Sequence, residues 1–203
     1  MDETDPRIRL AIRLIAQWHS RDAGEAAVDF WQRQFPTDMR DKSELAEGFD
    51  FLGVEAFNAG DLDEAKEAFF ALFLLRLAIV RELQDDRAAI GAFASAEDLL
   101  GVTLMETGQL SAAEELLGEA FRYREGLWQD APGDAHAAYL YGVGLAHLGR
   151  LEAAKGDAVA ARTLLSQAQD HLVEVDVRWP GVSFIGEALG DVTRRLNGLG
   201  PGA

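Results

Sequence analysis

Residues 52–72, LGVEAFNAGDLDEAKEAFFAL, predict two helices joined by a tight turn. Apolar and small residues recur at helical spacing on both sides of the pair Gly60-Asp61. Glycine ends a helix in the left-handed conformation, and aspartate caps the start of the next helix. Gly53 and Ala65 are small, which allows the paired helices to cross closely. The stretch is therefore expected to form an antiparallel helix pair.

The same pattern returns at a constant step of 48 residues. Residues 100–120 (LGVTLMETGQLSAAEELLGEA) and 148–168 (LGRLEAAKGDAVAARTLLSQA) align with the first stretch without gaps. The positions that keep this step are Gly53, Gly101 and Gly149; Gly60, Gly108 and Gly156; Ala65, Ala113 and Ala161; Leu52, Leu100 and Leu148; and Phe69, Leu117 and Leu165. At the same step, Asp38, Asp86 and Asp134 fall at expected helix N-caps. The chain is therefore predicted to be an array of helix pairs.

These stretches resemble the tetratricopeptide repeat (TPR) family, whose pattern has Leu-Gly, a Gly-Asp turn, a small alanine and then a large apolar residue. The aromatic residue that the family places three positions before the leucine is Phe49 in the first stretch, but Glu97 and Leu145 in the others. The 48-residue period exceeds the usual period of about 34 residues, so each helix gains about two turns, similar to kinesin light chain repeats. The resemblance implies an all-α, right-handed superhelical solenoid of antiparallel helix pairs.

A single TPR-like domain of about nine helices is expected over residues 1–203. The helices are predicted near 6–19, 22–35, 39–59, 62–83, 87–107, 110–129, 134–155, 158–178 and 182–197. The expected parts are a degenerate first repeat at 6–35, long repeats at 39–83, 87–129 and 134–178, a capping helix at 182–197 and a flexible tail at 198–203. The terminal units of repeat proteins commonly differ from the internal repeats, because they close the hydrophobic core.

Composition narrows the function classes. Asp and Glu number 35 against 19 Lys and Arg, so the net charge is −16, which disfavours nucleic acid and anionic membrane surfaces and favours basic partners. The absence of cysteine excludes disulfides and thiolate chemistry. The acidic start of the chain is unlike a secretory signal, and the apolar stretch Phe69–Val80 is too short to cross a bilayer. A cytoplasmic protein is expected.

Catalytic and metal-binding patterns are sparse. The histidines His19, His136, His147 and His171 form no recognised cluster. His171 and Glu174 have the spacing of one half of a di-iron motif, but such a site needs a second copy and two further carboxylates. The sequence contains neither a Gly-x-Ser-x-Gly elbow nor a phosphate-binding Gly-Lys-Thr loop. We therefore expect no enzyme activity, cofactor or metal.

The family resemblance also implies a concave groove lined by the first helix of each pair. Its positions carry over onto Glu47, Asp50, Val54, Phe57, Asn58, Asp98, Val102, Met105 and Glu106. Carboxylates alternate with apolar side chains in this set, so the groove is expected to accept a basic or amphipathic segment of a protein or peptide partner.

A second candidate surface lies on the second helix of the first long repeat. Phe70, Leu74 and Leu77 form one helical stripe, whereas most residues at the equivalent positions of the other repeats tolerate solvent. An exposed stripe of this size is typical of an interface. We expect a second copy of the chain or a partner to cover it; the competing interpretation is that the first repeat does so.

Two classes of function follow. The favoured one is a protein-binding scaffold or adaptor that captures a basic or amphipathic segment and also self-associates. Its variant is a self-assembling structural module whose main partner is itself. The alternative from a different class is a small-molecule-sensing domain or an enzyme.

Overall fold

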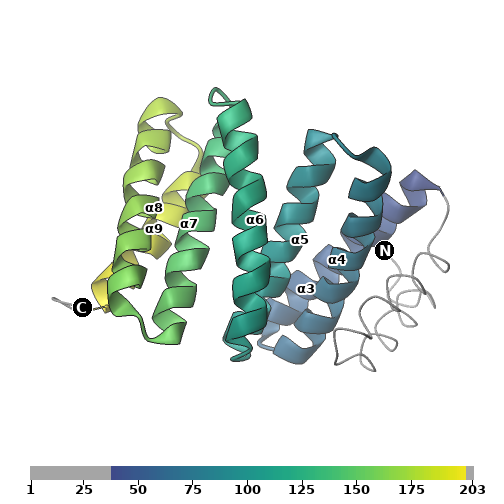
Figure 1. Ribbon diagram of the computed structural model, residues 1–203, viewed down its shortest axis with the longest axis horizontal. Helices are drawn as coiled ribbons and strands as arrows, with labels where there is room; N and C mark the ends of the chain where they lie inside the picture. The colour runs from purple at the N-terminus through teal and green to yellow at the C-terminus, as the bar shows by residue number, and fades with distance from the viewer. Residues whose placement is uncertain (1–37, 200–203) are drawn as a thin grey trace. The chain divides into compact units, whose positions relative to one another are not determined.

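The structure, a computed structural model, describes residues 38–199 and contains seven helices in this range (Figure 1). The helices are α3 (Met39–Ala59), α4 (Leu62–Leu83), α5 (Arg87–Glu106), α6 (Leu110–Asp130), α7 (Ala135–Lys155), α8 (Ala158–Arg178) and α9 (Ser183–Gly198). The described part of the chain contains no strand, so the all-α prediction is confirmed there. The helices predicted at 6–19 and 22–35, which would bring the count to nine, lie outside the described residues, as does most of the predicted tail.

Capping residues explain why the helix boundaries lie where the sequence predicts them. The side chains of Asp38, Asp86 and Asp134 each accept a hydrogen bond from a backbone N–H in the first turn of the helix that follows. At the turns inside the repeats, Gly60, Gly108 and Gly156 all have a positive φ, of 81°, 79° and 87°. This conformation favours glycine over every other residue. The predicted caps and turns are therefore confirmed.

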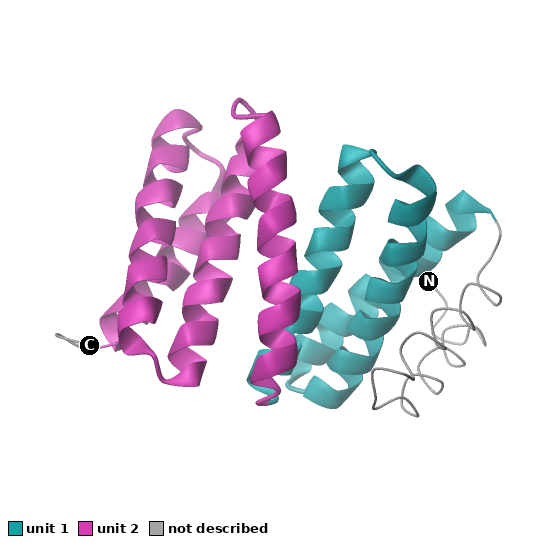
Figure 2. Ribbon diagram, viewed as in Figure 1, with its two compact units in different colours: residues 1–107 teal, residues 108–203 magenta. Residues whose placement is uncertain are grey.

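The chain divides into two compact units, which meet in sequence at Thr107 and Gly108 (Figure 2). The division falls at the turn of the second expected repeat, so α5 belongs to unit 1 and α6 to unit 2. Each unit has its own helix packing, and the two are described separately below.

Unit 1 is built around α4, which packs against both α3 and α5. Its largest fully buried side chains include Phe49 of α3 and Phe69 of α4. Gly53 makes this packing possible, because a Cβ atom at that position would lie 2.5 Å from Cε1 of the Phe69 ring. The buried amine of Lys42 on α3 also pairs with the carboxylate of Glu82 on α4. The close crossing predicted for this helix pair is therefore confirmed.

Unit 2 is built around α7 and α8, with α6 packed on α7 and α9 packed on α8. Its core includes Leu145, Leu165, Leu172 and Val192. A Cβ atom on Gly149 would lie 2.8 Å from Cγ of Leu165, so this pair repeats the Gly53–Phe69 contact at the equivalent positions of another helix pair. The two pairs lie two 48-residue steps apart in the sequence, and each makes the same packing contact in its own unit.

Among the described residues, α5 is the one helix that is long and apolar enough to cross a membrane by length and composition alone. Of its most apolar 18-residue stretch, 67% is buried inside the fold, as in the core helix of a soluble protein. The run that the sequence analysis singled out, Phe69–Val80, lies within α4.

Candidate protein-binding surface on helix α3

The predicted groove residues divide between the surface and the interior. On α3, the side chains of Glu47, Val54 and Asn58 are exposed, and those of Asp50 and Phe57 are half-buried. Of the four predicted groove residues on α5, only Glu106 is exposed. The exposed fractions of the other three, Asp98, Val102 and Met105, are 3%, 9% and 7%. The predicted set is therefore not presented together at the surface, and α3 carries the part of it that a partner can reach.

The exposed side of α3 contains a residue that the sequence analysis did not select. Phe51 is 62% exposed and lies at helical spacing from Glu47 and Val54, which is itself 37% exposed. We call the set Glu47, Phe51, Val54, Glu55 and Asn58 the α3 face; all five side chains are exposed. It combines an apolar centre with carboxylates on either side, along one side of a single helix.

The local sequence explains this arrangement. The opposite side of α3 is buried through Leu45, Phe49, Gly53 and Ala56, which recur at helical spacing. Residues two positions apart on a helix point to nearly opposite sides, so burial of Phe49 exposes Phe51. The signal was therefore present in the sequence: on a helix buried along one side only, just one of two phenylalanines at this spacing faces the core.

Asp50 lies at the margin of the α3 face and is electrostatically perturbed. Burial raises the pKa of its carboxyl group above the ordinary value of 3.8, and the positive charge of Arg76 on α4 opposes this rise. Because the folded state then binds the proton more tightly than the unfolded chain does, the ionised carboxylate destabilises the fold at neutral pH. That destabilisation declines as the pH falls through the raised pKa.

Replacing Arg76 with glutamine is expected to raise the pKa of Asp50 further, because the substitution removes a positive charge that opposes the effect of burial. The measurement is the pH dependence of the Asp50 carboxyl carbon shift by NMR in the wild type and in Arg76→Gln. A wild-type pKa at or below 3.8, or no rise in the variant, would contradict this account of the site.

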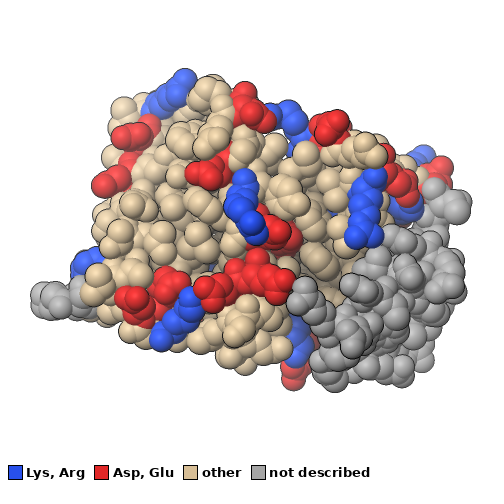
Figure 3. Space-filling model, viewed as in Figure 1, with Lys and Arg blue, Asp and Glu red and all other residues tan. Residues whose placement is uncertain are grey.

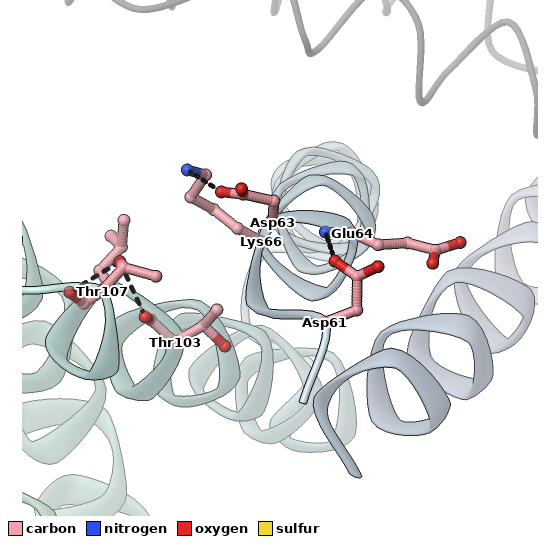
Figure 4. A network of polar contacts seen from close by, with 7 residues as sticks. Asp61, Asp63, Glu64, Lys66, Thr103 and Thr107 are labelled. Carbon is pink, nitrogen blue, oxygen red and sulfur yellow. Dashed lines mark hydrogen bonds and ion pairs between the residues drawn. The ribbon is translucent and has the colours of Figure 1, made fainter. Parts of the chain in front are cut away.

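The turn between α3 and α4 forms a shallow, open depression next to the α3 face. Figure 4 shows the polar side chains at this turn. It has a volume of about 460 Å³ and is lined by residues 59–63 and by Thr107 at the end of α5. Its polar groups are engaged in local structure: Asp61 caps α4 by accepting a hydrogen bond from the Glu64 N–H, and Asp63 pairs with Lys66 at 3.2 Å. The depression is accounted for by helix capping and offers no constellation for chemistry.

The predicted apolar stripe on α4 is largely covered within the chain. Leu74 is only 4% exposed, and Phe70 and Leu77 are half-buried. The Phe70 ring stacks on Phe73, which in turn contacts Phe93 of α5 with ring centroids 5.5 Å apart. Little of the stripe is left for a second copy to cover.

His171 serves packing within unit 2. The Nε2 atom of His171 lies 2.8 Å from the carbonyl oxygen of Ala138, and a carbonyl can only accept, so Nε2 donates. The His171 ring also contacts Trp128 and Tyr141 edge-on, at centroid distances of 5.2 and 4.9 Å. Within residues 38–199, no three His, Asp or Glu side chains form a group that could hold a metal ion. His19 lies outside this range.

Carboxylates of unit 2 are in part neutralised by neighbouring bases. Figure 3 shows acidic side chains gathered over the lower ends of α6, α7 and α8, with basic side chains among them. The amine of Lys155 bridges Glu114 of α6 and Glu152 of α7 at 2.9 and 3.0 Å, and these hydrogen bonds raise the pKa of Lys155.

No protein-family model matches the chain, and no curated protein matches it. Among solved structures, the chain is similar to the DHF119 filament, with 15% sequence identity, 96% of this chain and 95% of that chain covered, and a TM-score of 0.34. A likeness at this level identifies neither a family nor a shared fold.

Proposed function

We propose that the protein is a TPR-like adaptor whose α3 face captures a basic or amphipathic segment of another protein. The left-handed glycine at each of the three turns and the equivalent Gly53–Phe69 and Gly149–Leu165 contacts support a helical-repeat scaffold. We propose in addition that the repeats form a right-handed superhelix, as the resemblance to the TPR family implies. No enzymatic role is part of the proposal.

The exposure of Phe51 between carboxylates carries this proposal. Burying a phenylalanine side chain stabilises a complex by about 1.5–3 kcal/mol, so an exposed Phe51 with Val54 beside it offers a large apolar contact. Glu47 and Glu55 lie on the same side of the helix and favour Lys or Arg at the edge of that contact. An amphipathic helix with basic flanks satisfies both requirements, and helix-on-helix docking is a common mode of recognition.

The proposal is tested with a synthetic peptide of about 18 residues that places Leu and Lys at helical spacing, measured by fluorescence anisotropy. Phe51→Asp is expected to weaken binding at least about tenfold, although it adds a negative charge and would strengthen a purely electrostatic attraction. Glu47→Lys with Glu55→Lys is expected to weaken binding as well.

Matched controls lie on the exposed side of α8 in unit 2. Val177→Asp makes the same charge change at another exposed apolar residue, and Asp170→Lys with Glu174→Lys makes the same reversal at two exposed carboxylates. These controls are expected to retain the wild-type affinity. If the charge reversal on α8 weakens binding as much as the reversal on α3, the peptide responds only to net charge. If Val177→Asp weakens binding as much as Phe51→Asp, the α3 face is not the binding site.

A further inference from the structure

One segment of the chain has a composition opposite to that of the whole. Residues 7–21, RIRLAIRLIAQWHSR, contain four arginines and no acidic residue, although the protein carries a net charge of −16. Apolar residues recur at helical spacing through Ile8, Ala11, Ile12, Ile15 and Trp18. By its sequence, this segment has the chemistry that the α3 face is proposed to recognise.

We infer that residues 7–21 bind the α3 face of their own chain and compete there with partner proteins. The inference rests on the proposed function and adds its regulation. Phe51 and Val54 supply exposed apolar surface for the apolar residues of the segment. Glu47 and Glu55 lie on the same side of the helix, where they can pair with its arginines.

The charges of α3 favour this occupant. From residue 38 to residue 59 the chain has six acidic and two basic residues. Both bases are engaged, because Arg40 pairs with Glu44 at 2.9 Å and Lys42 pairs with Glu82. The surface therefore keeps an excess of negative charge that an arginine-rich segment complements.

Proximity in sequence favours binding within one chain over binding between chains. Only 17 residues, 22–38, separate the segment from α3. With residues 22–35 helical, as the sequence predicts, the connection spans roughly 31 Å. The α3 face ends at Asn58, roughly 30 Å along the helix from residue 38, so the face is within reach. A short tether raises the effective concentration of the segment to the millimolar range, far above that of a second copy in dilute solution.

The consequence is a threshold for partner binding. A partner segment must displace residues 7–21, so its apparent affinity is lower than the affinity of the open α3 face. If the tethered segment is present at about 1 mM effective concentration and binds with a Kd of about 0.1 mM, the apparent affinity falls about tenfold.

The test compares the full-length wild type with full-length Arg9→Glu plus Arg13→Glu, which removes half of the segment's arginines. The probe is a synthetic, dye-labelled peptide with the sequence of residues 7–21, measured by fluorescence anisotropy. The double variant is expected to bind this peptide about tenfold more tightly than the wild type, and the gain should disappear when Phe51→Asp is added. Equal affinity of wild type and double variant would overturn the inference.

The Leu/Lys peptide separates this inference from the proposed function. If it binds the α3 face but the 7–21 peptide does not bind the double variant, the inference fails and the proposed function stands. If neither peptide binds either protein, the proposed function fails and the inference falls with it.

A second measurement uses the absence of cysteine in the chain. Gln17→Cys and Ala59→Cys introduce two spin labels into the full-length protein, and pulsed electron paramagnetic resonance gives their separation. We expect a narrow distance distribution that broadens with Phe51→Asp and persists when labelled protein is diluted into unlabelled protein. If the narrow distance distribution is lost on dilution, the contact is between chains. If the distribution does not respond to Phe51→Asp, the segment does not bind the α3 face. Either result overturns the inference.

Discussion

Phe69→Ala is expected to lower the free energy of unfolding of unit 1 by about 3–5 kcal/mol, because it leaves a cavity in the centre of the α3–α4 packing. Phe69 is fully buried, and its ring lies directly over Gly53, where the two helices cross. Phe49, also fully buried, contributes to the same core from α3. Urea unfolding, followed by hydrogen exchange of amides in α3 and α4, measures the loss and assigns it to this unit.

A double-mutant cycle tests whether the contact between Gly53 and Phe69 determines the stability of the α3–α4 packing. Gly53→Ala is expected to destabilise unit 1 by about 1–3 kcal/mol, since the new methyl group would lie 2.5 Å from the ring. Phe69→Ala removes the ring that the new methyl group would meet, so it should reduce the cost of Gly53→Ala. Additive effects of the two substitutions would contradict the packing argument.

Gly118→Ala on α6 provides the matched control for helix propensity. No atom of a neighbouring side chain lies within 4 Å of a Cβ at this position. The substitution is therefore expected to stabilise its helix by up to about 1 kcal/mol, as alanine does relative to glycine in an open helical site. Opposite signs for Gly53→Ala and Gly118→Ala would show that close packing, and not glycine itself, determines the outcome.

Helix positions were predictable because their signals are local. A cap such as Asp86 and a left-handed residue such as Gly156 act within one turn of the helix they delimit. The predicted bounds of α3, α4 and α8 agree with the structure, and those of the other four described helices differ by a single residue at one or both ends. The close crossing at Gly53 was also predictable, because the 48-residue step repeats a residue that is costly inside a helix.

The candidate site was less predictable because exposure is a tertiary property. Family positions place Asp98 and Met105 on a groove, but their burial depends on how α5 packs, which no local pattern determines. The burial of Leu74 has the same origin: a stripe that reads as exposed in one helix is covered once the helix is packed. Phe51 was missed for a different reason. The groove residues were chosen from the family positions, and Phe51 is not one of these, although helical spacing places it on the side of α3 away from Phe49.

Helix α7 packs against both α6 and α8 and has a glycine facing each of these helices. A Cβ on Gly144 would lie 3.0 Å from Cδ2 of Phe121 on α6, and a Cβ on Gly142 would lie 2.7 Å from Cδ2 of Leu172 on α8. Gly142→Val is therefore expected to cost about 2–3 kcal/mol of unfolding free energy in unit 2, because three carbon atoms enter a filled space. Near-ultraviolet circular dichroism during urea unfolding monitors the effect, since Trp128 stacks on Tyr141 close to this contact.

Leu172→Ala tests whether the contact between α7 and α8 causes the loss of stability expected for Gly142→Val. Alone, it should destabilise unit 2 by about 2–5 kcal/mol, because the side chain is fully buried. Combined with Gly142→Val, it vacates the space that the valine needs, so the double variant should lose clearly less stability than the sum of the two single losses. Gly186→Val on α9, where no neighbouring atom lies within 4 Å, should change the stability by no more than about 0.5 kcal/mol. A strictly additive double variant, or a loss at Gly186 equal to that at Gly142, would mean that valine disturbs the helix itself and not its contact with α8.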